Sequence, residues 1–124
     1  MGARKDVVGL MGKLSIQAEE KGEVVVIRLT GQADVFTSRD LDALGSAYLD
    51  RGLSGILIEA SRLTYLDSAT LSALLHLQKK AGERGGTVAV CGLGGEPRRV
   101  FELSGFDGVF PFYSTEAEGL AALT

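Results

Sequence analysis

The stretch "LTYLDSATLSALL", residues 63–75, joins an apolar segment to an amphipathic helix, with Asp67 and Ser68 at the junction. Leu71 and Leu74 follow at the spacing that places side chains on one face of a helix. Asp and Ser are favoured N-cap residues because their side-chain oxygens accept hydrogen bonds from backbone N–H groups of the first turn. The stretch therefore predicts a strand, a capped turn and a helix, in that order.

Upstream of this stretch, the pattern predicts a β-hairpin and a first helix. Apolar and polar residues alternate from Leu14, and residues 24–31 are rich in β-branched side chains, as strands are. A short turn between the two segments makes them an antiparallel hairpin. Apolar residues at helical spacing follow, with the N-cap expected at Thr37 or Ser38 and the stop at Gly52.

Downstream, strands and helices alternate. The apolar runs at residues 55–61 and 87–92 predict inner strands. A short helix follows with Pro97 in its first turn. Pro111 lies inside the next segment, residues 109–113, which is therefore either an edge strand or not a true strand. A last helix starts at a Ser114 cap. Strands separated by helices form parallel pairs with right-handed crossovers. We therefore expect a single α/β domain with a mixed sheet of four to five strands, an N-terminal hairpin and about four helices.

Composition and charge restrict the class of protein. Residues 1–13 show little periodicity and are assigned to an N-terminal arm, either loose or packed as a short segment, and residues 14–124 to the domain. The net charge of −3 argues against nucleic acid as a partner. No run reaches the roughly 18 apolar residues that span a bilayer, and no signal-peptide core is present. We therefore expect a cytoplasmic protein without direct membrane insertion.

The sequence offers little for catalysis. It contains no nucleophile elbow, no phosphate-binding loop and no zinc motif, and Cys91, in an apolar run, predicts a buried inert thiol. The one histidine, His76, lies on the polar side of its helix, roughly 12 Å along the axis from Ser68. That separation is far beyond hydrogen-bonding reach. We expect no enzyme activity, no cofactor and no metal site.

The junction at Asp67 and Ser68 has two interpretations. In the first, the pair only caps a helix, which stabilises it by roughly 0.5–2 kcal/mol. In the second, Ser68 is a switch, because hydroxyl-bearing residues such as Thr64 and Thr70 form a polar rim at the end of a central strand, where α/β sheets place their sites. A phosphate there adds about −1.5 to −2 charges, which a helix N-terminus tolerates and a docked partner does not.

Residues 55–123, together with the upstream run "VVVIRLTGQADVFTSRDLDAL", resemble the STAS domain of bacterial anti-sigma-factor antagonists. The resemblance extends from about Leu14 to Leu123 and is specific at residues 31–34, 66–71 and 100–106. It implies the same α/β fold and a regulatory protein–protein interaction.

The resemblance also implies a site and its partners. The serine after the aspartate in the strand-to-helix turn is the family's phosphoacceptor, which here is Ser68. Asp34 matches the family's partner-contacting aspartate and Asp67 the acid beside the acceptor; with Thr64 and Thr70 they form the candidate partner-binding set. The implied partners are an anti-sigma factor that is also a serine kinase with a histidine-kinase-type ATPase fold, and a PP2C-type phosphatase.

The chain departs from the family's pattern next to the acceptor. Ala69 and Thr70 follow Ser68 where the family usually has Ser or Thr and then Gly, so the turn is stiffer and Thr70 becomes an alternative acceptor. Glu59 replaces an aspartate in the preceding strand. Two other functions stay open: a constitutive STAS subunit of a membrane-associated assembly such as a lipid-transport ATPase, and a nucleotide-binding module centred on the same rim.

Overall fold

The computed structural model describes residues 4–11 and 13–124, which form one sheet with helices on both of its faces. The strands are β1 (Arg4–Met11), β2 (Leu14–Lys21), β3 (Val24–Ala33), β4 (Gly55–Leu66), β5 (Thr87–Cys91) and β6 (Phe112–Tyr113). The helices are α1 (Val35–Asp50), α2 (Ser68–Gly82), α3 (Gly95–Leu103) and α4 (Glu116–Leu123), with a short 3-10 turn, η1 (Phe106–Gly108), after α3.

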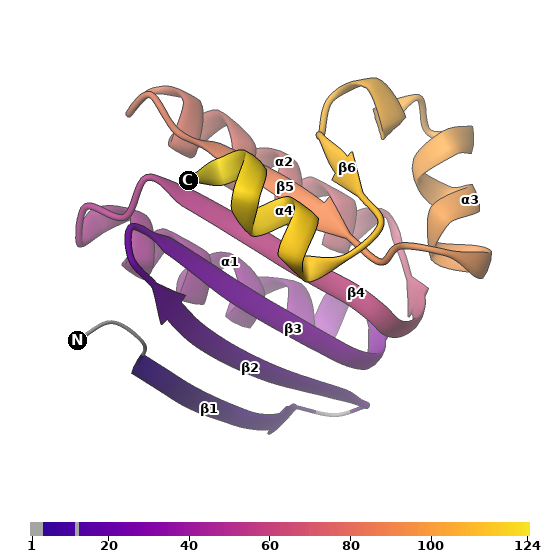
Figure 1. The fold of residues 1–124 in the computed structure, drawn as a ribbon. Coiled ribbons are helices and arrows are strands. Elements are labelled where there is room, and N and C mark those ends of the chain that lie inside the picture. Colours follow the sequence, from indigo (N-terminus) through magenta and orange to yellow (C-terminus); the bar gives the residue numbers. More distant parts are fainter. Residues whose placement is uncertain (1–3, 12) are drawn as a thin grey trace.

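The six strands lie in sequence order across the sheet. β1, β2 and β3 pair antiparallel, whereas β3, β4, β5 and β6 pair parallel. Helices α1 and α2 cover one face and α4 covers the other, while α3 lies at one end of the sheet (Figure 1). The expected mixed α/β sheet with an N-terminal hairpin and four helices is confirmed.

The N-terminal segment differs from the expected arm. Residues 4–11 form β1, which pairs with β2, so they belong to the sheet and raise the number of strands above the four to five expected. A strand at the sheet edge is held by backbone hydrogen bonds to one neighbour and needs no regular side-chain pattern. The absence of periodicity in this segment was therefore a poor guide to its structure.

The core lies mainly between the sheet and the two helices α1 and α2. Its largest fully buried side chains come from both layers, Leu14, Ile16, Ile27, Leu29, Leu41, Leu49, Ile56, Ile58, Leu74 and Leu77, and from α3, Phe101. A smaller cluster under α4 contains Cys91 together with apolar side chains of β3, β4 and β5. Burial and then the nearby carboxylate of Glu59 raise the pKa of the Cys91 thiol to about 12, so the thiol stays protonated and unreactive.

Two helices begin at other residues than expected. Asp34, not Thr37 or Ser38, caps α1, and Thr37 completes a capping box from the third position of the helix. Thr115 rather than Ser114 caps α4. Asp, Ser and Thr are all good N-cap residues, so where several stand close together the pattern cannot choose among them.

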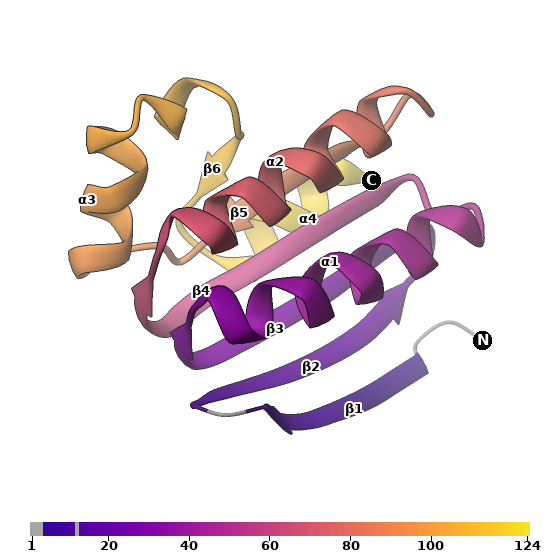
Figure 2. The same cartoon turned by 180° about the vertical axis from the view of Figure 1, so that it is seen from behind.

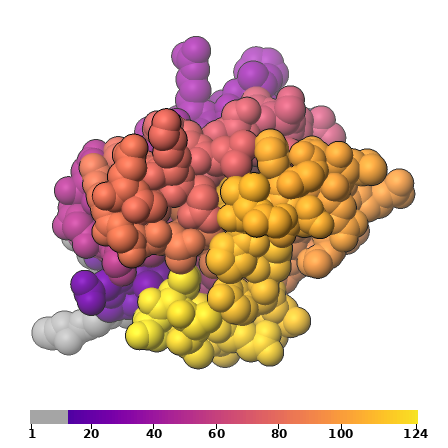
Figure 3. All heavy atoms as spheres, turned by 90° about the horizontal axis from the view of Figure 1, so that it is seen from above, coloured from indigo at the N-terminus to yellow at the C-terminus, as the bar shows by residue number. Residues whose placement is uncertain are grey.

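The C-terminal part of the chain adds a distinct lobe. The segment containing α3 and η1 lies beside α2 and projects from the body of the molecule, as the orange spheres show (Figure 3). Phe101 of α3 anchors this lobe through edge-to-face contacts with Phe110 and Phe112, at ring-centroid distances of 5.6 and 5.5 Å. The short strand β6 lies at the sheet edge, as expected, but Pro111 directly precedes it instead of lying within it.

Candidate functional site

The two central strands bring the predicted site residues to one edge of the sheet. Ala33, the last residue of β3, pairs with Leu66, the last residue of the parallel strand β4. Asp34 directly follows β3 and caps α1, and Asp67 directly follows β4 and caps α2. Both helices therefore start at the same edge and run side by side across the sheet (Figure 2).

Asp67 is the N-cap residue that the first interpretation of the junction requires. Its Oδ1 accepts hydrogen bonds from the backbone N–H of Thr70, at 3.1 Å, and from the Thr70 hydroxyl, at 3.2 Å. Thr70 is completely buried. Its hydroxyl is thus out of reach of a kinase or a partner, so Thr70 fits neither the role of alternative acceptor nor that of a direct partner contact.

Ser68 is the first residue of α2, and its side chain is exposed. In the part of the chain that the structure describes, the Ser68 hydroxyl makes no hydrogen bond. It stands at the positively polarised end of a helix of 15 residues, where unpaired N–H groups favour negative charge. An accessible hydroxyl in this position can receive a phosphoryl group without displacing any contact of the fold.

Asp34 caps α1 in the same way that Asp67 caps α2. Its Oδ1 accepts from the backbone N–H groups of Phe36, at 2.9 Å, and Thr37, at 3.2 Å. Among the described residues, Oδ2 takes part in no hydrogen bond in either Asp34 or Asp67. Both carboxylates therefore keep one oxygen that can accept a hydrogen bond from another molecule.

Thr64 is exposed at the same edge and also has a structural role. Its hydroxyl donates a 3.0 Å hydrogen bond to the carbonyl oxygen of Gly31. The pairing of β3 with β4 shifts register between Gly31 and Gln32, and the Thr64 bond bridges the strands at this irregularity. The hydroxyl of Thr64 thus helps to set the position from which the two helices start.

Exposed apolar side chains at this edge are a feature that the sequence analysis missed. Phe36 is 84% exposed, Val35 is 55% exposed and Tyr65 is 47% exposed. The helical position of Phe36 could have indicated its exposure. At 100° per residue, Phe36 falls about 140° around the helix from Leu41, and the buried residues of α1 include Thr37 and Leu41. An apolar side chain that far from the buried stripe points to solvent or to a partner.

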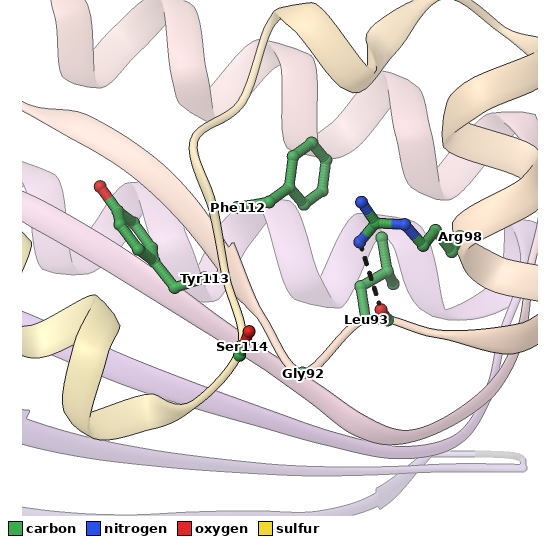
Figure 4. Close-up of a pocket in the computed structure, with 6 residues that line it drawn as sticks. All are labelled: Gly92, Leu93, Arg98, Phe112, Tyr113 and Ser114. Carbon is green, nitrogen blue, oxygen red and sulfur yellow. Dashed lines mark hydrogen bonds between the residues drawn. The ribbon is translucent and has the colours of Figure 1, made fainter.

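Two recesses in the described part of the surface lie near this edge. One of about 430 Å³ includes Thr64 and Ser61 together with the loop before α3, and no basic side chain is among the residues that line it. Another, of about 350 Å³, lies between Arg98 and Phe112, and contains no predicted site residue (Figure 4). Neither recess combines a candidate site residue with a cation that would neutralise a phosphate.

His76 lies on the surface, 58% exposed in its side chain, with Nδ1 2.8 Å from Oδ1 of Asp42 on α1. Within residues 13–124, whose side chains the structure describes, no group of three or more His, Cys, Asp or Glu residues could hold a metal ion. Over the same residues, no helix has the length and apolar character needed to cross a membrane.

Comparison with known proteins gives consistent matches over most of the chain. The anti-sigma F factor antagonist of Paenibacillus polymyxa is 29% identical over 111 residues, which cover 89% of this chain and 95% of that protein. A crystal structure of an anti-sigma factor antagonist from Mycobacterium paratuberculosis has a TM-score of 0.79 and 27% identity, covering 89% of this chain and 93% of that one.

A third match concerns a modified protein. The Bacillus cell fate determinant SpoIIAA in its phosphorylated form has a TM-score of 0.72 and 26% identity, covering 88% of this chain and 99% of that chain. The family model of the STAS domain matches residues 15–119, which extend from β2 into α4 and include the whole edge described above. The chain belongs to the STAS domain family.

Proposed function

We propose that this protein is an anti-sigma-factor antagonist that binds an anti-sigma factor and is switched off by phosphorylation of Ser68. The observation that carries the proposal is the exposed hydroxyl of Ser68 at the start of α2, beside the cap carboxylate of Asp67. The names of the relatives support the general role. The similar protein known in a phosphorylated form supports the switch.

The fold tolerates a phosphate on Ser68. A phosphoserine carries about −1.5 to −2 charges and three acceptor oxygens. At the N-terminus of α2 it faces unpaired backbone N–H groups and the positive end of the helix dipole, an interaction worth about 0.3–2 kcal/mol. This gain offsets repulsion by Asp67, so the phosphorylated domain stays folded.

A bound partner does not tolerate the same phosphate. Ser68 is exposed at the edge that also carries the exposed side chains of Phe36 and Tyr65, and a dianion that a partner buries there without a matching cation costs several kcal/mol. Each 1.4 kcal/mol lowers the affinity about tenfold. Phosphorylation therefore changes binding strongly and the stability of the domain little.

The partners follow from this role. The anti-sigma factor is a serine kinase with a histidine-kinase-type ATPase fold, and a PP2C-type phosphatase removes the phosphate. Asp34 and Asp67 contact the partner through their free Oδ2 atoms, and Thr64 contacts it from the exposed end of β4. Thr70, which is buried, acts by fixing the carboxylate of Asp67. The protein itself is not an enzyme and uses no cofactor.

Affinity capture tests this function. Wild type, Ser68→Ala and Ser68→Asp are immobilised, exposed to lysate of the source organism, and the bound proteins are identified by mass spectrometry. We expect an anti-sigma factor with an ATPase fold on wild type and on Ser68→Ala, the matched control, and its loss from Ser68→Asp. A membrane-transport complex bound equally to all three would contradict the proposal and favour a constitutive subunit.

A further inference from the structure

We propose that Phe36 is the anchor of the interface and that it inserts into an apolar pocket of the anti-sigma factor, bordered by basic side chains or N–H donors. The inference rests on the proposed function and adds to it the residue that determines which partner fits. It is drawn from the exposure, the rigid placement and the electrostatic surroundings of Phe36.

The exposure of Phe36 has no role within the domain. Five large apolar side chains are exposed among those the structure describes, and three of them, Val35, Phe36 and Tyr65, lie at the edge that carries Ser68. The remaining two, Leu103 and Val109, belong to the lobe formed by α3 and η1. Phe36 is the most exposed of the five, at 84%, and leaving so large an apolar surface in water is unfavourable unless it is covered by a partner.

The backbone of Phe36 is held in place although its side chain is exposed. Its backbone N–H donates a 2.9 Å hydrogen bond to Oδ1 of Asp34, within the capping box that starts α1. An aromatic side chain has few rotatable bonds, and its backbone here is already ordered, so little entropy is lost on binding. Aromatic residues with these properties are typical anchors of protein–protein interfaces.

Charged groups around Phe36 indicate the border of the complementary pocket. Asp34 caps the helix that carries Phe36, Arg39 and Asp40 follow one turn later on α1, and Asp67 follows the end of the paired strand β4. Three carboxylates and one guanidinium give a local net charge of −2. Because Oδ2 of Asp34 and of Asp67 is free, a border of cations or N–H donors on the partner is complementary to this surface.

The same arrangement couples the anchor to the switch. The anchor is on α1 and the acceptor on α2, at the ends of paired strands, so a phosphate on Ser68 leaves Phe36 in its place. The phosphate acts on the border of the pocket, where it adds negative charge beside Asp67. The charges at the border of the pocket then no longer match, and only the apolar contact made by Phe36 remains favourable.

The test measures affinity with purified proteins. Each anti-sigma factor with an ATPase fold encoded in the source genome is titrated by calorimetry into wild type, Phe36→Ala, Leu103→Ala and Ser68→Asp. We expect Phe36→Ala to weaken binding at least tenfold and Leu103→Ala, which removes a side chain that is 81% exposed on another surface, to change it less than twofold. Melting temperatures should match, because neither side chain is part of the core.

The outcomes separate this inference from the proposed function. Equal binding by wild type and Phe36→Ala, with binding lost in Ser68→Asp, would overturn the anchor and leave the switch standing. If none of the anti-sigma factors binds wild type, the function and the anchor both fail. A homodimer that Phe36→Ala dissociates would assign the surface to a second copy of this chain and overturn the inference.

A cross-linking measurement examines the pocket itself. In the complex, Phe36→p-benzoylphenylalanine should cross-link on illumination to apolar residues of the anti-sigma factor, with basic residues adjacent in its structure. The same photoreactive group in place of Leu103 serves as the control and should give no cross-link. Cross-links from position 36 only to polar surface residues, or none, would contradict an apolar pocket.

Discussion

At the scale of single residues, Asp67 shows how one side chain serves both the fold and the site. Oδ1 caps α2 and satisfies the buried hydroxyl of Thr70, while Oδ2 stays free beside Ser68. The capping role followed from the sequence because Asp before a helical apolar pattern is a strong N-cap signal. The burial of Thr70 did not follow, because a β-branched hydroxyl residue in a first helical turn fits either an exposed or a buried position.

A substitution at Asp67 tests this account. Asp67→Ala removes the cap of α2 and leaves the Thr70 hydroxyl buried without its acceptor, so we expect the free energy of unfolding to fall by about 2–3 kcal/mol. Asp67→Asn keeps an acceptor oxygen at the cap and should cost less than about 1 kcal/mol. Urea denaturation of the two variants and wild type measures both values. Equal losses for the two would show that the cap oxygen is not what stabilises the turn.

At the scale of elements, a half-buried network of ion pairs links α4 to the sheet. The guanidinium of Arg28 on β3 donates to Glu116 at 3.0 and 2.8 Å and lies 2.9 Å from Glu19 of β2. Burial alone would raise the pKa of Glu116, but Arg28 and then Lys21 outweigh it and lower this pKa below its usual range. The hydrogen bond to Glu116 is also the main reason why the pKa of Arg28 is raised.

This network makes part of the stability dependent on pH. Because the pKa of Glu116 is lower in the folded than in the unfolded state, its contribution is complete above about pH 5 and is lost as the pH falls through the folded pKa. Glu116→Gln should therefore reduce the free energy of unfolding by about 1–2 kcal/mol at pH 7, and less as the pH approaches 3. Chemical denaturation at a series of pH values measures the difference.

The control for this prediction is Glu102→Gln. Glu102 forms an exposed pair with Arg98 at 3.4 Å on α3, which should contribute less than about 0.5 kcal/mol at any pH. If the effect of Glu116→Gln were the same at pH 7 and pH 3, the ion pair would not be its cause.

The sequence pattern predicts some helix and strand boundaries correctly and misses others. The start of α2 was correct because one Asp-Ser junction precedes a clear helical pattern. β4 is continuous to Leu66, beyond the apolar run that ends at residue 61, although Ser61 and Arg62 are polar and exposed. Pairing with the long strand β3 extends it, and that tertiary contact is not visible in the local pattern.

At the scale of the whole molecule, the order of strands and helices was enough to predict the central architecture. Right-handed crossovers between parallel strands bring the carboxyl ends of β3 and β4 together, and with them Asp34, Asp67 and Ser68. The exposure of Phe36 did not follow from this order, because the order of elements does not say which side of α1 its second residue faces. Its position relative to the edge became visible only in three dimensions.

The most direct test of the central claim compares the phosphorylated and unphosphorylated protein. The anti-sigma factor and ATP are used to phosphorylate it, the modified residue is mapped by mass spectrometry, and the affinity of each form for the anti-sigma factor is measured by calorimetry. We predict phosphate on Ser68 alone, an affinity at least tenfold lower, and an unfolding free energy unchanged or raised by up to about 2 kcal/mol. Equal affinity of the two forms, or phosphate on another residue, would contradict the account.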